Sequence, residues 1–298
     1  MPIPKPNIGE TQSTFMGRCV SFLIDEGKPE QQAVAICYQE YRDANKREAH
    51  KKYMTWKAYD NKIRSFEKYA ERIFTKALRE QLNAYLNEVE RVGKIDFDLE
   101  GIVTSEPIQE AFEKVYGRVM KVFGQETYAQ FQETLKKEIS VDWDVIISGW
   151  LVDNTTDKIV SVTNTTKAEI LNKVSIALKE GTPIPIFAKD LTKAYGFSTR
   201  RGMLIGRTEI VSASNAGSLL GAKASGVPSK KIWLATQDNR TRDLHLEVDG
   251  QVVNTLDGNF QVGGEEMKYP ADSSLGASPS NTINCRCTII YEPYDDNI

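Results

Sequence analysis

From about residue 44 to residue 92 the chain contains neither proline nor glycine, the residues that most often break a helix. This stretch is dense in Lys, Arg and Glu, which suit the exposed surface of a helix. Its apolar residues recur at alternating steps of three and four, as on one helical face. They are Trp56, Tyr59, Ile63, Phe66, Ala70, Ile73 and Ala77, then, in a shifted register, Leu78, Leu82, Tyr85 and Val89. This pattern predicts a long helix whose apolar stripe packs within the chain or against another protein as a coiled coil.

A helical hairpin is predicted just before it, over residues 11–45, with a break at Gly27 and Pro29. Cys19 and Cys37 fall on the two apolar stripes of this hairpin, so we expect them to face each other as small core residues. A disulfide or a metal site is the alternative for this pair.

Three further segments carry helix start and stop signals: residues 105–124, 166–181 and 198–226. Each begins with a Ser or Thr that can cap a helix and ends at a glycine. Periodicity leaves the state of residues 143–162 open between helix and strand.

In the last third of the chain, the helical patterns give way to short strand-like pieces separated by Asp-Gly turns. These pieces are residues 230–236, 250–253, 266–270 and 285–291. The predicted fold class is α+β: a mainly helical N-terminal two-thirds with a long helix, followed by a small C-terminal α+β domain. The expected domains are a helical hairpin module at 1–45, the long helix and a helical bundle at 46–150, and the α+β domain at 151–298, with core motifs in 200–291.

Composition narrows the class of protein. The chain has 298 residues, 40% of them apolar and 27% charged, as in ordinary soluble proteins. No apolar run approaches the length of a membrane span, so we expect a cytoplasmic protein with no membrane partner. Four cysteines are too few and too unevenly placed for a secreted disulfide framework, which favours a reduced compartment.

Charge is unevenly distributed although the net charge is only -3. Residues 199–242 carry eight Lys and Arg against two acids, whereas residues 243–298 carry ten acids against two bases. Such a split indicates a field with two poles that could orient the protein on a charged partner. The basic stretch could contact nucleic-acid phosphates or could only solvate a helix face.

Chemistry-bearing residues concentrate near the C-terminus. Asp238, Arg240, Arg242, His245 and Asp249 lie within twelve residues, and a Cys-Arg-Cys run follows later in the chain. Each of the five can form charge-assisted hydrogen bonds.

Four interpretations compete for this group. A zinc site could use His245, Cys285 and Cys287 with Asp249 or water, although no Cys-x-x-Cys knuckle completes the tetrahedron. A thiolate paired with His245, or a nuclease-like His/Asp site, would make an enzyme. A disulfide between Cys285 and Cys287 would be strained. A buried polar and thiol core that includes Trp233 and holds irregular loops together is the interpretation that the residues favour.

The order of these residues resembles the phage head-morphogenesis family called MuF, the minor head proteins of tailed phages. The resemblance covers about 90 residues, and a looser similarity extends upstream to about residue 155. Separately, residues 9–41 resemble a small helical module attached to phage head-assembly proteins. The matching positions are Arg207, Thr208, Glu209, Asn215, Trp233, Asp238, Arg240, Thr241, Arg242, His245, Asp249, Gly250, Phe260, Tyr269, Pro270, Asp272, Asn284, Cys285, Arg286 and Cys287.

The resemblance implies a structural, low-copy protein of the capsid interior, present in the host cytoplasm during assembly. Its implied partners are the portal protein, other capsid proteins and packaged double-stranded DNA, with roles in procapsid assembly, DNA packaging or ejection. No catalytic residue, cofactor or metal is expected. The residues expected to form the structural core of the motif are Arg207, Glu209, Trp233, Asp238, Arg240, Arg242, His245, Asp249, Gly250, Asn284, Cys285, Arg286 and Cys287.

An enzyme linked to a MuF domain is the alternative, either an ADP-ribosyltransferase-like toxin or a nuclease. The Arg-Thr-Glu run at 207–209 is similar to part of an ADP-ribosyltransferase pattern. It lies in a predicted helix, where Arg207 and Glu209 would point apart. The sequence also lacks the clustered acids that a metal-dependent nuclease needs.

Overall fold

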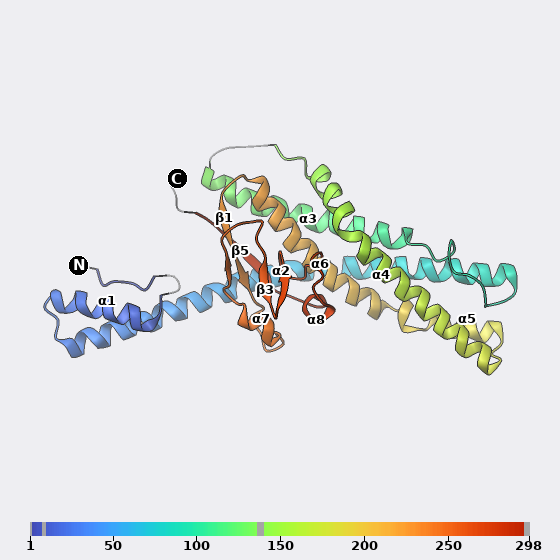
Figure 1. Ribbon diagram of the computed structural model, residues 1–298, viewed down its shortest axis with the longest axis horizontal. Coiled ribbons are helices and arrows are strands. Elements are labelled where there is room, and N and C mark those ends of the chain that lie inside the picture. Colours follow the sequence, from blue (N-terminus) through green and yellow to red (C-terminus); the bar gives the residue numbers. More distant parts are fainter. Residues whose placement is uncertain (1, 8–9, 136–139, 295–298) are drawn as a thin grey trace. The chain divides into compact units, whose positions relative to one another are not determined.

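A computed structural model describes residues 2–7, 10–135 and 140–294 and has an α+β fold that is mostly helical (Figure 1). Its contacts divide the chain into two compact units, Met1–Ala58 and Tyr59–Ile298. The helices are α1 (Gln12–Asp25), α2 (Glu30–Val92), α3 (Glu106–Leu135), α4 (Trp143–Glu180), α5 (Ile184–Thr192), the 3-10 helix η1 (Tyr195–Phe197), α6 (Thr199–Ala224), α7 (Asp243–Glu247) and α8 (Pro279–Thr282). The strands are β1 (Ser229–Leu234), β2 (Val252–Val253), β3 (Phe260–Val262), β4 (Glu265–Met267) and β5 (Thr288–Pro293).

The first unit contains the predicted helical hairpin, formed by α1 and the beginning of α2. Cys19 and Cys37 face each other across it as expected, but their sulfur atoms are bonded at 2.07 Å. The expectation that both remain reduced thiols is therefore wrong for this pair. The physical reason is the close approach of two small side chains in the hairpin core, where both residues have no exposed surface.

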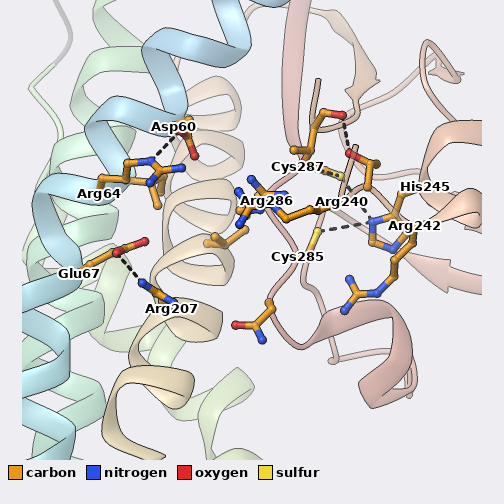
Figure 2. A pocket seen from close by; sticks show the side chains of 15 residues that line it. Asp60, Arg64, Glu67, Arg207, Arg240, Arg242, His245, Cys285, Arg286 and Cys287 are labelled. Carbon is orange, nitrogen blue, oxygen red and sulfur yellow. Dashed lines mark hydrogen bonds and ion pairs between the residues drawn. The ribbon is translucent and has the colours of Figure 1, made fainter. Parts of the chain in front are cut away.

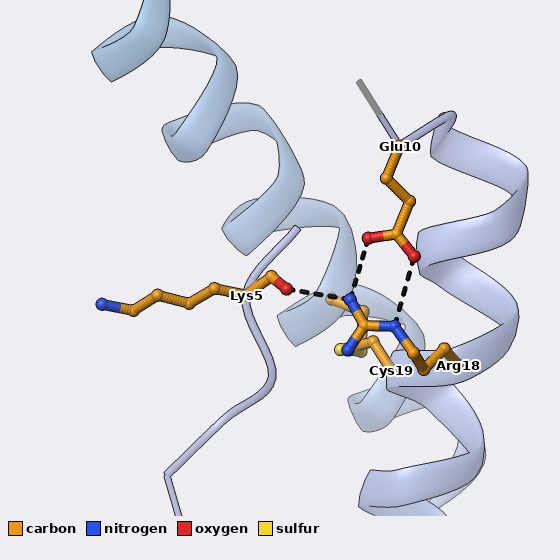
Figure 3. The surroundings of a disulfide bond; sticks show 5 residues. Lys5, Glu10, Arg18 and Cys19 are labelled. Atoms are coloured by element: carbon orange, nitrogen blue, oxygen red, sulfur yellow. Dashed lines mark hydrogen bonds and ion pairs between the residues drawn. A yellow bond between two sulfur atoms is a disulfide. The ribbon is translucent and has the colours of Figure 1, made fainter. Parts of the chain in front are cut away.

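The polypeptide before α1 also folds onto this hairpin. Arg18 donates to the Glu10 carboxylate at 2.8 Å and to the Lys5 carbonyl at 2.9 Å (Figure 3). Tyr41 stacks on Phe15 with ring centroids 5.8 Å apart. Together with the disulfide, these contacts join Lys5 and Glu10 to the two helices of the hairpin.

In the second unit, the apolar stripe of α2 packs within the chain. Ile63, Phe66 and Ala70 share one core with residues of α3, α4 and α6. Ile73 packs against this core and is partly buried, and Phe74, which the sequence pattern did not include, is fully buried in it. Further along, Leu82, Tyr85 and Val89 contribute to a second core with α4 and α5. This part of the stripe thus belongs to an intramolecular bundle, which was one of the two predicted alternatives.

Helices α3 and α6 approach each other closely because glycines line their contact. A Cβ atom on Gly217 would lie 2.6 Å from the Met120 carbonyl oxygen, and one on Gly221 would lie 2.3 Å from the Gly124 carbonyl oxygen. Gly124 was expected to end α3, but the helix continues to Leu135. The glycine instead leaves room for the Trp143 ring and the α6 backbone, so packing outweighs its low helix propensity.

Helix α4 is longer than expected and settles the state of residues 143–162 as helical. The capping box at Thr166 predicted that a helix starts there, but Thr166 lies in the interior of α4. Thr166 is fully buried, and its hydroxyl donates to the Val162 carbonyl at 3.1 Å within the helix. Arg201 Nη1 donates to the same hydroxyl at 3.0 Å, so the residue serves a tertiary contact. The predicted end at Gly181 is confirmed, with its left-handed backbone at φ 64°.

Helix α6 confirms its predicted cap, since the Ser198 hydroxyl accepts from the Arg201 backbone N-H. The strands after it form an antiparallel sheet in the order β2-β1-β5 and a separate β3-β4 hairpin, of which β3 was not predicted. Cys285 and Cys287 were expected on the closing strand, but β5 begins only at Thr288. The two cysteines lie on the segment that leads into it, because the turn after α8 ends there with Asn284 at φ 55°.

The three-part domain division predicted from the sequence remains a prediction, and its two boundaries lie inside α2 and α4. Within the described ranges, no helix combines the length and apolar character needed to cross a bilayer.

Candidate functional site

The motif residues gather around the C-terminal half of α6, where a buried amide joins distant segments. Asn215 Nδ2 donates to the carbonyl oxygens of Cys287 at 3.1 Å and Pro270 at 3.3 Å. Its Oδ1 accepts from the Thr288 hydroxyl at 3.0 Å. Only 1% of Asn215 is exposed, so each bond satisfies a polar group that water cannot reach.

Six residues earlier on α6, Glu209 lies in a buried ion pair. Its carboxylate accepts from Lys158 Nζ of α4 at 2.8 Å and from the Tyr116 hydroxyl of α3 at 2.6 Å. Lys158 also donates to Ser212 at 3.1 Å. Burial lowers the pKa of Lys158, but the Glu209 carboxylate, Tyr269 and Asp272 together outweigh this effect and raise that pKa overall. Burial first, and then Glu209, raise the pKa of Tyr116, which remains a hydrogen-bond donor.

Arg207 lies two residues before Glu209 and has a different partner. Its Nη2 donates to Glu67 of α2 at 3.3 Å. The two ends of the Arg-Thr-Glu run therefore reach different helices, and their charges do not meet in one site.

A second ion pair connects the loop after β1 with the segment before β5. Arg286 donates through both terminal nitrogens to the Asp238 carboxylate, at 2.7 and 2.9 Å. Arg240 contributes a further bond to Asp238 at 3.3 Å. The hydrogen bonds from Arg286 hold the pKa of Asp238 well below its usual range. This bidentate geometry fixes the direction of both backbones.

Backbone contacts of other motif residues shape the same region. Asp249 Oδ1 accepts from the Ala235 N-H at 2.9 Å, and Gly250, at φ 83°, donates to the Trp233 carbonyl at 2.8 Å. Trp233 is buried against the Phe260 ring with centroids 5.3 Å apart. Two further bonds hold the segment before Cys285: the Asn284 N-H donates to the Thr208 hydroxyl, and Arg242 donates to the Ile283 carbonyl.

A histidine and two thiols meet at the centre of this region. The Nδ1 atom of His245 lies 3.4 Å from the Cys287 sulfur and 3.7 Å from the Cys285 sulfur, and all three residues are at most 1% exposed. Hydrogen bonding from Cys285 lowers the pKa of the Cys287 thiol, and the same contact raises that of Cys285. The chain thus brings together three of the four ligands proposed for a zinc site, but Asp249 is not among the group.

These three side chains line one wall of a pocket of about 330 Å³ (Figure 2). Residues of α2 and α6 line the opposite wall, where Asp60 pairs with Arg64 and Glu67 pairs with Arg207. The pocket is rich in guanidinium groups, which come from Arg64, Arg207, Arg240, Arg242 and Arg286. Most of them already bind a carboxylate, so the charge in the pocket is largely balanced.

Sequence reasoning did not find Tyr116 or Lys158, the partners of Glu209. They lie 93 and 51 residues away from it in the chain and on other helices. Lys231 was also missed: it is fully buried, donates to the Lys268 carbonyl at 2.7 Å and lies 5.2 Å from the Phe260 ring centroid. No local pattern marks such residues, because only the tertiary fold removes them from water.

Comparison with known proteins gives relatives of two kinds. The chain is 32% identical to an NAD(+)--arginine ADP-ribosyltransferase EFV of Enterococcus faecalis over 124 residues, which are 41% of this chain and 25% of the relative. It is 30% identical to the minor head protein GP7 of Bacillus phage SPP1 over 132 residues, which are 42% of each.

An uncharacterized protein of Haemophilus influenzae is 28% identical over 186 residues, which are 58% of this chain and 37% of the relative. The chain thus spans less than half the length of these curated relatives, and no solved structure matches it significantly. Residues 168–290 match the family model described as Phage Mu protein F like protein. The matched residues include α6 and the whole histidine and thiol cluster, so the similarity to the Phage Mu protein F like family covers this part of the chain.

Proposed function

We propose that this chain is a structural minor head protein of a tailed phage. It joins the head during assembly in the host cytoplasm, lies next to the portal protein and remains in the virion interior, where it acts in DNA packaging or ejection. The family match and the relative named as a minor head protein support this proposal.

The observation that carries the proposal is that the charged motif residues are bound by partners inside the fold. Glu209 is held by Lys158 and Tyr116, and Asp238 is held by Arg286. A general acid or base must reach a proton on a substrate. Glu209 is only 8% exposed and joins three helices, which suits a residue that maintains architecture.

The basic stretch gives little support for contact with packaged DNA. Two cations of the basic stretch, Arg201 and Lys231, are buried and bind backbone carbonyls. Lys223 and Lys230 pair with Asp257 and Glu292. Residues 199–242 therefore do not present all their charge on one surface, as a phosphate-binding face would require.

An enzyme remains the second candidate, because one relative is named as an ADP-ribosyltransferase. The matched stretch covers only a quarter of that relative. In this chain the Arg-Thr-Glu run has its charges on separate partners, Glu67 and Lys158. For a nuclease, the only group of three or more His, Cys, Asp or Glu ligands in the described residues is the histidine and thiol cluster, which contains no acid.

Co-expression with the portal protein of the same phage tests the proposal. We expect the untagged chain to co-purify with tagged portal rings and to appear as additional density when the rings are imaged. A portal ring that never retains the chain, in assembly reactions that contain all capsid proteins, would contradict it.

The enzyme candidate is tested with the same protein. Purified chain is incubated with NAD+ and, separately, with double-stranded DNA, alongside the variants Glu209→Ala and His245→Ala. We expect no turnover from any of them. Consumption of NAD+ or cleavage of DNA that either variant abolishes would replace the structural assignment by the enzymatic one.

A further inference from the structure

We infer that His245, Cys285 and Cys287 form a binding site for one zinc ion in the C-terminal domain. The inference rests on the arrangement of these three side chains and is independent of the proposed role in the phage head. It departs from the metal-free interior that the sequence favoured.

The two nitrogen-to-sulfur distances are close to those that a tetrahedral zinc ion imposes. Zinc binds sulfur at about 2.3 Å and imidazole nitrogen at about 2.0 to 2.1 Å, so two such ligands at the tetrahedral angle lie about 3.6 Å apart. The His245 Nδ1 atom is 3.4 Å from one sulfur and 3.7 Å from the other. All three ligand atoms lie within 4.8 Å of one another, so one ion can reach them together.

The formal charges of the three ligands also balance the charge of a zinc ion. Two thiolates and a neutral imidazole carry a total charge of -2, which a divalent ion neutralises. The site is buried, and a neutral assembly avoids the large cost of placing an isolated charge away from water. Sulfur and imidazole ligands in this ratio favour zinc over the oxygen-seeking ions magnesium and calcium.

Without an ion, the cluster leaves hydrogen-bonding groups unsatisfied. A neutral imidazole offers one lone pair, so Nδ1 can accept from only one of the two thiols at a time. The other ring nitrogen, Nε2, is buried and has no hydrogen-bond partner among the described residues. A metal bound at Nδ1 would take up both sulfurs at once and would leave Nε2 as an N-H group near the Trp233 ring, whose plane is nearly perpendicular to that of His245 with the centroids 5.7 Å apart.

The surrounding fold holds the ligands in place before any ion arrives. Cys-x-Cys in an extended segment directs both sulfurs to one side, and Arg286 between them points the other way to Asp238. Asn215 fixes the Cys287 carbonyl, and Thr236 lies 3.7 Å from the Cys287 sulfur. Such supporting contacts orient metal ligands and strengthen binding.

The fourth ligand is a water molecule supplied from the pocket that the three side chains line. Asp249, the alternative considered from the sequence, accepts from the Ala235 N-H and does not belong to the cluster. A three-ligand site needs no Cys-x-x-Cys knuckle, and for that reason the sequence pattern alone did not favour it.

Metal analysis of the full chain tests the inference. The protein is expressed with zinc in the medium, purified without a histidine tag and dialysed against metal-free buffer. We expect about one zinc ion per chain, measured by inductively coupled plasma mass spectrometry. Cys285→Ser, Cys287→Ser and His245→Gln should each lose most of it, whereas the double variant Cys19→Ser with Cys37→Ser should retain it, since that pair lies in the other unit.

A second measurement does not depend on how the variants fold. Cobalt replaces zinc in the unaltered protein, and we expect the intense visible absorption of a tetrahedral ion together with a thiolate-to-cobalt charge-transfer band. Protein that binds no zinc and no cobalt while both C-terminal thiols titrate as free after denaturation would overturn the site. So would zinc that all three single variants retain.

Discussion

The Asn215 side chain donates a 3.1 Å hydrogen bond to the carbonyl of Cys287, which lies 72 residues further along the chain. One amide in the middle of α6 thereby holds the segment that leads into β5. The same side chain binds the Pro270 carbonyl and the Thr288 hydroxyl, so three parts of the C-terminal domain depend on it. The asparagine carboxamide can do this because it offers two N-H donors and an acceptor oxygen in one compact planar group.

Asn215→Ala should therefore destabilise the fold strongly. Two carbonyl oxygens and a hydroxyl would lose a partner in a buried place, and we expect the free energy of unfolding to fall by about 2 to 4 kcal/mol. Urea unfolding followed by circular dichroism measures it. Asn164→Ala on the exposed face of α4 is the matched control and should stay within about 0.5 kcal/mol. Equal effects of the two variants would show that the buried contacts contribute little.

Lys158→Met should leave the Glu209 carboxylate buried without its cation. Breaking a buried pair at one end costs about 3 to 5 kcal/mol of stability, whereas removing both charges costs much less. We expect the double variant Lys158→Met with Glu209→Met to recover a large part of the loss in thermal or urea unfolding. Lys76→Met, which breaks an exposed pair with Glu80, should cost less than about 1 kcal/mol. Additive losses from the two buried substitutions would argue against the pair.

Gly217→Ala should push α3 and α6 apart. The new methyl group would stand 2.6 Å from the Met120 carbonyl oxygen, and we expect a loss of about 1 to 3 kcal/mol from overpacking. Gly149 lies inside α4 with nothing within 4 Å of its Cβ position. Gly149→Ala should thus stabilise the protein by about 0.5 to 1 kcal/mol through helix propensity. Chemical unfolding of both variants measures these changes in stability. A stabilising effect of Gly217→Ala would contradict the observed packing.

The lowered pKa of Lys231 predicts that the free energy of unfolding rises with pH. Burial, with a contribution from Lys223, lowers its pKa from 10.5 to about 8. Between these values the unfolded chain binds more protons than the folded chain, so the free energy of unfolding increases as the pH rises from about 8 to 10.5, by up to about 3 kcal/mol. The difference in unfolding free energy between the wild type and Lys231→Met, measured at several pH values, isolates this effect. Lys179→Met on the exposed surface should leave the slope unchanged, and a slope that survives in Lys231→Met would refute the assignment.

Periodicity and caps predicted most of the helices, because these signals act within a few residues. The long helix, the hairpin before it, the Ser198 cap and the end at Gly181 all followed from them. The failures lie where a distant element overrides a local signal. Gly124 makes room for Trp143 instead of ending α3, and Thr166 binds Arg201 instead of starting a helix.

By itself, the sequence determined the α+β class, the helical stripes and the order of motif residues that marks the family. These features depend on the spacing of side chains along the chain. Only the tertiary structure decided which charges would be buried together, as for Glu209 with Lys158, and which thiols would meet His245. Such pairings depend on removal from water and on approach within a few ångströms across long stretches of chain, which local spacing does not encode.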